Sequence, residues 1–295
     1  MNAPHRILVA TDFSPAGHAA VARAGQLAQQ YGAELTVFHA TPDWRLFSHR
    51  ATAHQEHYAQ ITSNADELMR AEIGWLESRF HLHPRSEIHR DRATLGIVRA
   101  IESVQPDLLV IGAGGEQVLP SGSTVLGGTA LKLISRLTLP VLLVRNPAPD
   151  PYQSTMAAVF GEPGVTQSLV RWADLLAGSG VCHVVRAYEA PYLHRMRLCR
   201  LSEAQITECA EEQRQLAQEE CAALGRNVHP TSRLVFHIVR GTPLPTVLDQ
   251  VTLHAPQLLV IGQHPHLADE HPGGWAAGLG ARLAYHSPTD VLLVP

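Results

Sequence analysis

Three short stretches in the first half of the chain carry residues that could bind an anionic ligand. Thr11 and Asp12 follow an apolar run, and the Asp12 carboxylate could accept hydrogen bonds from a ribose hydroxyl or a base edge. Glycines fill the second stretch, Gly112–Gly115, and open the third, Gly127–Thr129. Glycine lets backbone N–H groups approach an anion because no Cβ stands in the way, and a helix start offers unpaired N–H donors to phosphate. Together the three stretches predict a nucleotide site.

Neither of the two common nucleotide fingerprints is present. The chain has no GxxxxGK[ST] sequence, which excludes a P-loop with its phosphate-binding lysine. A GxGxxG directly after the first expected strand is absent too, which argues against a dinucleotide site. No candidate general base stands beside a nucleophile, and no carboxylate pair suits two Mg²⁺ ions. We therefore expect no enzyme and no catalytic residues, and any ATP hydrolysis should be slow and incidental.

The elements that would position these residues alternate between strands and helices. Short apolar runs are typical of buried parallel strands, and Ser14-Pro15 predicts a helix start that Gly32 closes. Strands are expected over 7–11, 34–40, 87–89, 107–111, 141–144, 157–160, 182–187, 234–239, 258–261 and 291–294. Helices are expected over 14–32, 58–80, 95–104, 127–137, 168–176, 202–224, 247–253 and 278–285. Strict alternation favours a parallel, doubly wound sheet.

The second half of the chain repeats the first. PDLLVIG returns as PQLLVIG, and Gly112 and Gly262 stand 150 positions apart, as do Val141 and Val291. A constant offset across two strands indicates a duplicated domain. The prediction is an α/β fold of two tandem doubly wound domains, residues 1–148 and 155–295, each with a mostly parallel five-stranded sheet. The proline-rich stretch 145–154 is the expected linker.

Composition excludes several classes of function. Only 17% of the residues are charged, the net charge is −4, and no run of Lys and Arg recommends a nucleic acid or an anionic membrane as partner. No signal peptide is visible, and no apolar run approaches the roughly 20 residues that span a bilayer. The four cysteines form no CxxC pair and are interpreted as reduced thiols. We therefore expect a cytoplasmic protein.

At these motifs the chain resembles the universal stress protein family, over essentially its whole length and twice. ILVATDFSPAG matches the end of the family's first strand, and DLLVIGAGG…LGGTALKLISRLTLPVLLVR matches its signature region. The resemblance implies a nucleotide α-hydrolase-like, Rossmann-like fold that binds ATP or AMP, with or without Mg²⁺. It also implies that adenine meets the backbone at Ala40. The residues expected to hold the nucleotide are Thr11, Asp12, Ala40, Gly112, Gly115, Gly127, Gly128 and Thr129.

Two departures from the family pattern affect the phosphate region. Eleven residues separate Gly115 from Gly127, which is longer than the family's usual spacing. If the last strand fixes the register, Gly128 stands where the family usually has serine, and Thr129 comes one place late. The loop 116–126 carries hydroxyl groups that could replace the missing one.

The second half has lost the corresponding contacts. Pro265, which has no N–H to donate, stands where the first half has a glycine. Ala277 and Leu279 replace a glycine and a threonine at the helix start. Asp12 has no counterpart, because the matching strand end reads VFGE over 159–162. We therefore expect one nucleotide per chain, in the first domain.

The 18 histidines invite a search for a metal site. None has the spacing of an HExxH motif or a Cys/His finger, and His-x-His in a loop is more often exposed to solvent. We therefore expect no metal site. The histidines considered were His81, His83 and His89 in the first half and His264, His266 and His271 in the second.

The leading interpretation is a tandem universal stress protein with a stress-response or regulatory role. The alternative is an interaction module that binds an unknown protein partner with both nucleotide sites defunct, so that Asp12 and the glycines are relics. A third reading is an enzyme of the same superfamily, such as an adenylate-forming ligase or a pyrophosphatase. The Ser-Gly-Gly-x-Asp-Ser loop expected after the first strand of such enzymes is missing.

Each half ends in an aliphatic strand, 141–144 and 291–294. A terminal strand leaves unpaired N–H and C=O groups along the sheet edge unless another segment covers it. Fusing two copies through a short linker makes pairing of the two edges intramolecular. We therefore expect the last strands to lie antiparallel about a pseudo-twofold axis, as an intramolecular pseudo-dimer. Other surfaces could build a true homodimer.

Overall fold

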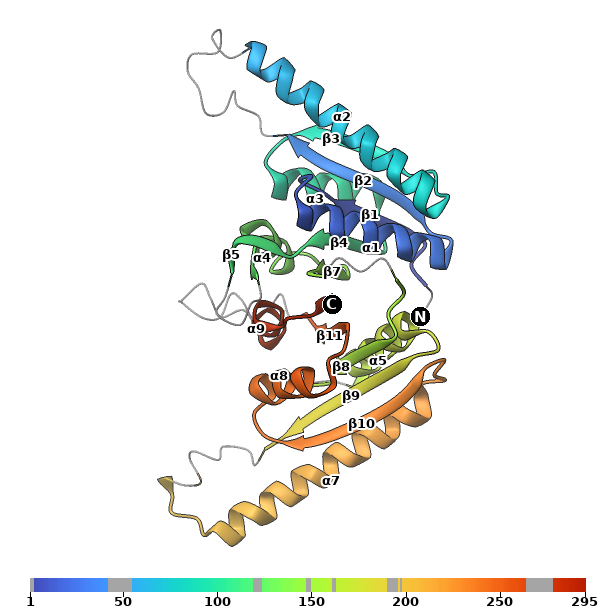
Figure 1. Cartoon of the computed structure of the whole chain (residues 1–295). Coiled ribbons are helices and arrows are strands. Elements are labelled where there is room, and N and C mark those ends of the chain that lie inside the picture. Colours follow the sequence, from blue (N-terminus) through green and yellow to red (C-terminus); the bar gives the residue numbers. More distant parts are fainter. Residues whose placement is uncertain are drawn as a thin grey trace. The chain divides into compact units, whose positions relative to one another are not determined.

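The computed structural model describes residues 3–41, 55–118, 124–146, 150–160, 163–189, 196, 198–263 and 278–295. The chain divides into two compact units, residues 2–151 and 152–295, which we call the first and the second domain (Figure 1). The second-domain positions Gly161, Pro265 and Ala277 lie outside the described residues, as do His264, His266 and His271. Within the described part, every helix is too short or too polar to span a lipid bilayer.

The first domain is built on five parallel strands in the order β7-β4-β1-β2-β3. From β1 the chain moves one way to β2 and β3, and then back to β4 and β7 on the other side. Strand order therefore reverses between β1 and β4. The strands are β1 (Arg6–Ala10), β2 (Glu34–Thr41), β3 (Arg85–Arg90), β4 (Leu108–Gly112) and β7 (Val141–Val144), and the helices are α1 (Pro15–Tyr31), α2 (Gln55–Phe80), α3 (Ala93–Val104) and α4 (Gly128–Ile134).

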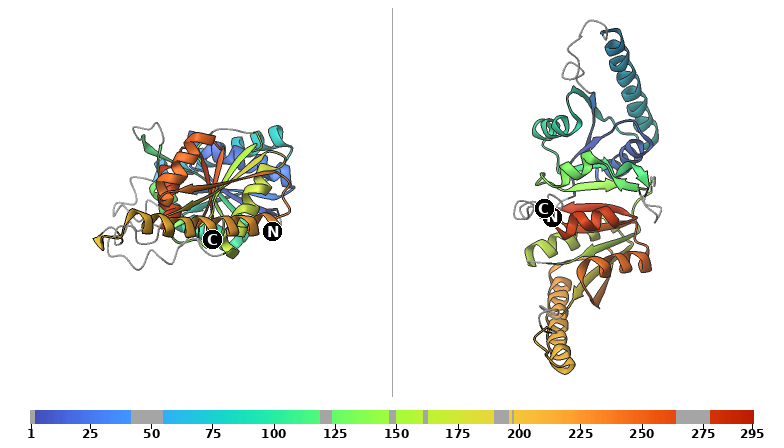
Figure 2. Two further views of the ribbon diagram at one scale, coloured as in Figure 1. Left: turned by 90° about the horizontal axis from the view of Figure 1, so that it is seen from below. Right: turned by 90° about the vertical axis from the view of Figure 1, so that its left-hand side faces the viewer.

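Helices cover both faces of this sheet, α1 and α2 on one and α3 and α4 on the other (Figure 2). The central strands are apolar throughout because both of their faces are buried, as in Leu108–Ile111, whose side chains are at most 4% exposed. Helix α1 begins after the N-cap Ser14 with Pro15 at its first position, and ends at Gly32 with φ 66°. These are the start and stop signals that the sequence predicts.

The second domain repeats the arrangement with the strand order β10-β9-β8-β11-β12, again all parallel. Its strands are β8 (Ser154–Ala158), β9 (Val181–Tyr188), β10 (Arg233–Arg240), β11 (Leu258–Gly262) and β12 (Asp290–Val294). Its helices are α5 (Pro163–Ala177), α7 (Glu203–Asn227), α8 (Pro243–His254) and α9 (Leu279–His286). The predicted doubly wound α/β class is confirmed.

Two local features differ from the sequence prediction. Between β4 and α4 the chain forms an antiparallel pair, β5 (Gly114–Val118) and β6 (Thr124–Leu126), where a plain loop was expected. Strand β8 starts at Ser154, earlier than the expected Ala157 and within the stretch interpreted as linker. Ser-Thr-Met-Ala-Ala has little strand character of its own, so pairing with β9 and β11 on either side decides its conformation.

Candidate functional site

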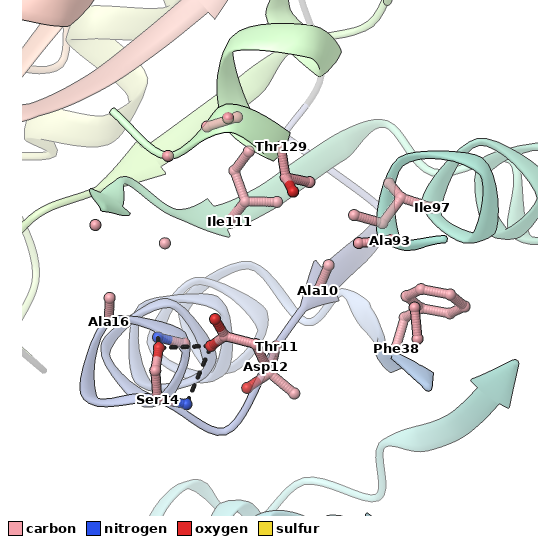
Figure 3. Close-up of a pocket in the computed structure, with 17 residues that line it drawn as sticks. Ala10, Thr11, Asp12, Ser14, Ala16, Phe38, Ala93, Ile97, Ile111 and Thr129 are labelled. Atoms are coloured by element: carbon pink, nitrogen blue, oxygen red, sulfur yellow. Dashed lines mark hydrogen bonds between the residues drawn. The ribbon is translucent and has the colours of Figure 1, made fainter. Parts of the chain in front are cut away.

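A cavity of about 220 Å³ opens at the carboxyl ends of β1 and β4, where strand order reverses (Figure 3). Open α/β sheets bind their ligands at this place. Gly115 follows the lining residue Gly114 in β5, where the structure describes only the backbone. The other residues that the sequence predicts for a nucleotide all line the cavity: Thr11, Asp12, Ala40, Gly112, Gly127, Gly128 and Thr129.

Asp12 is held in a tight turn just beyond β1. The Thr11 N–H donates to the Phe38 carbonyl at 2.9 Å, and Phe13 adopts the left-handed φ of 61°. Asp12 Oδ1 accepts from the backbone N–H of Ser14 at 3.0 Å and from its hydroxyl at 2.5 Å, as Figure 3 shows. Asp12 is exposed, and its Oδ2 accepts no hydrogen bond from the described residues. The carboxylate is thus oriented, with one oxygen left to accept from a ligand.

Ser14 links this turn to helix α1. Its Oγ accepts from the Gly17 N–H at 3.1 Å and so caps the helix. A Cβ at Gly17 would lie 2.7 Å from both Asp12 Oδ1 and Thr11 Oγ1, so only glycine lets the turn fold over the first helical residues. The turn therefore has a capping role whether or not a ligand binds.

The end of β2 supports the same turn from the other side. His39 Nδ1 lies 2.8 Å from the Thr11 carbonyl oxygen, and the Phe13 and His39 rings stand 4.3 Å apart. The contact between the tilted rings and the hydrogen bond fix the position of Thr11 relative to β2. Sequence reasoning missed these supports, because Phe13 and His39 meet only once β1 and β2 are paired.

The glycines of the site fall into two kinds. A Cβ at Gly112 would come within 2.7 Å of the Ala16 carbonyl oxygen, and one at Gly114 within 2.8 Å of the Ala16 Cβ. These two glycines are required by the close approach of α1, independently of any ligand. A Cβ at Gly128 would meet nothing within 4 Å, although Gly128 lines the cavity. Packing gives no reason for glycine there.

One wall of the cavity is apolar and the opposite rim is polar. Phe38, Ile97 and Ile111 are buried side chains of the wall, and the Thr129 side chain points from α4 toward the cavity in Figure 3. Sequence reasoning missed Ile97 and its neighbour Ala93, both from α3. Their signal was the position of α3 directly after β3, which brings its start to the same edge of the sheet. An apolar wall with a few convergent polar groups is typical of small-molecule sites.

Two arginines at and just after the end of β3, and the histidines considered in the first half, lie outside the lining of the cavity. Arg90 and Arg92 are exposed and are not among the described residues that line the cavity. His81 and His83 are exposed, and His89 lies 3.5 Å from Glu87. In the described part of the chain, none of these three histidines belongs to a group arranged to hold a metal ion.

The second domain lacks the acidic group. The Val159 N–H donates to the Val185 carbonyl at 2.9 Å, as the Thr11 N–H does to Phe38, so Phe160 stands where the first domain has Asp12. Its ring instead lies 5.8 Å from the Arg186 guanidinium carbon. At the constant sequence offset of 150, Leu279 takes the place of Thr129. Among the described positions, the charged acceptor and the hydroxyl are both gone.

Comparison with known proteins agrees with this geometry. The model of the universal stress protein family matches residues 4–145. A universal stress protein structure from Archaeoglobus fulgidus DSM 4304 is similar to the chain with 13% identity and a TM-score of 0.65, covering 99% of this chain and 96% of that one. A putative universal stress protein from Pseudomonas aeruginosa UCBPP-PA14 has 18% identity and a TM-score of 0.62, covering 99% and 93%.

A protein of unknown function from Pseudomonas aeruginosa PAO1 is similar with 17% identity and a TM-score of 0.60, covering 99% of this chain and 92% of that one. No match is found among curated proteins. At these identities the structural likeness shows the fold, and the family model adds the family. The first domain, whose residues 4–145 match the family model, is thus a universal stress protein domain.

Proposed function

We propose that the first domain binds an adenine nucleotide, ATP or AMP, and that the chain acts in a stress response as a regulator, not as an enzyme. The observation that carries the proposal is the cavity itself. It gathers residues from β1, β2, β4 and the start of α4 that the sequence predicts for one ligand. They meet at the reversal of strand order, where sheets of this kind bind nucleotides.

The cavity suggests how a nucleotide would lie. The wall formed by Phe38, Ile97 and Ile111 suits the flat apolar base, close to the backbone at Ala40. Asp12 Oδ2 is placed to accept from a ribose hydroxyl. Phosphates would then lie toward Gly127–Thr129, where packing leaves space beside Gly128. Asp12 is the one carboxylate among the described lining residues, so a Mg²⁺ ion would be held mainly by the phosphates.

The experiment that tests this is mass spectrometry of ligand released from the purified, denatured full chain. It is combined with calorimetric titration of ligand-free protein with ATP and with AMP. We expect an adenine nucleotide in the released fraction, or saturable binding on titration. Absence of both would overturn the proposal.

A second candidate, an interaction module with a defunct site, is favoured by one observation. Packing against Ala16 alone accounts for Gly112 and Gly114, so these glycines would persist without a ligand. This candidate predicts no nucleotide binding and capture of a protein partner. It does not account for the open space at Gly128.

Cytoplasmic location is part of the same proposal. All four cysteines are free, with Cys182 and Cys221 buried. Free thiols are typical of reducing compartments. Cell fractionation with an antibody against the full chain checks the location, and recovery outside the cytoplasm would contradict it.

A further inference from the structure

Three histidines of the second domain lie together, His183 on β9, His237 on β10 and His254 in the last turn of α8. In the parallel pairing of the two strands, His237 stands opposite Val185. Alternate residues of a strand point to the same face, so His183 and His237 share one face of the sheet. Helix α8 contacts β9 and brings His254 to them. We call these three residues the histidine cluster.

The cluster has dimensions close to those of a metal site. His183 Nδ1 lies 2.9 Å from His237 Nε2, and one ring nitrogen from each histidine lies within 4.8 Å of the others. The His254 ring stacks on that of His183 at 4.6 Å and stands 4.3 Å from that of His237. In a tetrahedral zinc site, bonds of about 2.0–2.1 Å place ligand nitrogens roughly 3.3 Å apart. Small side-chain rotations would bring the three nitrogens to one ion.

Not every ring nitrogen of the histidine cluster has a hydrogen-bond partner among the described residues. His254 Nε2 is buried and has no hydrogen-bond partner among the described residues. The contact between His183 and His237 is a hydrogen bond only if one nitrogen keeps a proton and the other a lone pair. Buried polar atoms without partners cost free energy. A cation that accepts a lone pair from each ring would remove this cost.

Charge around the cluster is compatible with a cation. Burial, followed by the proximity of His254, His237 and Arg233, lowers the pKa of His183 to about 4. A metal ion binds the neutral form of imidazole. Arg233 is the unfavourable neighbour, but it is exposed, so water and salt screen its charge.

The first domain offers an internal comparison. Its strand pairing sets Glu87 opposite Phe38, in the way that His237 stands opposite Val185, so Glu87 takes the place of His237. The same register places Thr36 at the position of His183. The last residue of α3 is Val104, where α8 ends with His254. The shared fold therefore does not require three histidines at this place.

We propose that His183, His237 and His254 bind a divalent transition-metal cation of the Zn²⁺ class, with a fourth coordination position left to solvent or to another donor. Such an ion would link α8 to β9 and β10. Sequence reasoning expects no metal site, and it missed this cluster because the three histidines come from three elements and match no spacing motif. Cys182 is not a ligand, since it points to the opposite face of β9 from His183.

Titration of the metal-free full chain with Zn²⁺ and with Co²⁺ tests the proposal. We expect one ion per chain, and a Co²⁺ spectrum with ligand-field bands but without a thiolate charge-transfer band. His183→Ala and His237→Ala should each lower the affinity at least about 100-fold, since loss of an outer-shell partner alone costs 10–100-fold. His229→Ala is the matched control, because this exposed histidine of the second domain lies outside the cluster.

Thermal unfolding gives a second readout. Zn²⁺ should raise the unfolding temperature of the parent chain and not that of the alanine variants, because an ion stabilises the state that binds it. If the alanine variants fail to fold, His183→Gln and His254→Gln decide the same question with closer side-chain size. The proposal is overturned if the parent binds neither ion. It is also overturned if folded cluster variants bind Zn²⁺ as the parent does, since the ligands would then lie elsewhere.

Discussion

At the scale of single residues, the two carboxylate oxygens of Asp12 have different roles. Oδ1 accepts both hydrogen bonds from Ser14, which caps α1, while Oδ2 faces the cavity opening without a described partner. A capping turn and a binding residue are therefore not alternatives at this position. The structure allows both, and mutation can separate them.

Asp12→Ala should weaken nucleotide binding by the first domain without unfolding it. A hydrogen bond to a charged group contributes about 1.5–3 kcal/mol, so the affinity should fall roughly 10- to 150-fold. Titration calorimetry with ATP measures this. Asp66→Ala, which removes an exposed carboxylate from α2, is the control and should bind as the parent does. Equal affinity of Asp12→Ala and parent would show that the site is assigned wrongly.

Two glycine substitutions distinguish a glycine that leaves room for a ligand from one that the packing of α1 requires. Gly128→Ala should leave the unfolding temperature unchanged, because its Cβ meets nothing within 4 Å, yet it should weaken nucleotide binding. Gly112→Ala should instead destabilise the domain by about 1–3 kcal/mol, because its Cβ would come within 2.7 Å of the Ala16 carbonyl oxygen. Denaturant unfolding and calorimetry measure the two effects. Unaltered binding in Gly128→Ala would favour the relic interpretation.

The four thiols should differ in reactivity. Burial is the main reason that the pKa of Cys182 is raised to about 12 and that of Cys221 to about 11. Both groups are therefore protonated thiols near pH 8, where the exposed Cys199 is accessible to reagent. Labelling of the native chain with a thiol reagent, followed by peptide mapping, should modify Cys199 before Cys182 and Cys221. Early modification of Cys182 would contradict the described packing of β9.

At the scale of elements, the sequence predicts what depends on near neighbours in the chain. Apolar runs located the central strands, and Ser14, Pro15 and Gly32 located both ends of α1. Strand β8 was placed too late, because its small residues become a strand only between β9 and β11. The same limit applies to the site. Thr11 and Asp12 follow directly from a strand end, whereas Ile97 reaches the cavity only through the packing of α3.

The histidine cluster shows the limit most clearly. His183 and His237 lie 54 residues apart in the chain, and their contact depends on the register of β9 and β10. His254 joins them only because α8 ends at that position of the sheet. Sequence reasoning considered histidines that lie close together in the chain. Among the described residues, His81, His83 and His89 do not belong to a group that could hold a metal ion.

Pairing of the last strands, β7 and β12, remains a prediction. Both are short, aliphatic and buried, and the edge of each sheet needs a partner for its backbone groups. We expect an intramolecular antiparallel contact between them. A cysteine scan along 141–144 and 291–294 in a background without exposed thiols should give at least one disulfide within a monomer. Failure of every pair to cross-link, or cross-links formed only between chains, would rule the contact out.

At the scale of the whole molecule, the chain contains two copies of one fold, and we expect a nucleotide site in only one of them. Phe160 stands where the first domain has Asp12 in the strand pairing, and the sequence offset of 150 sets Leu279 at the place of Thr129. We therefore predict a stoichiometry of one nucleotide per chain. Titration calorimetry measures it, and Asp12→Ala should abolish most of the binding heat. A stoichiometry near two would place a site in the second domain.

The glycines at the end of β4 have a consequence for how such chains diverge. Gly112 is fixed by the approach of α1, so selection for a folded domain maintains it even when no ligand is bound. The second domain keeps Gly262 at the equivalent strand end while Phe160 replaces the acidic residue. Two selective pressures thus act on one signature, and they can be relaxed separately. Under the proposed function, the acidic residue after the first strand distinguishes a copy that binds a nucleotide from one that does not, whereas the glycine shows only that the copy folds.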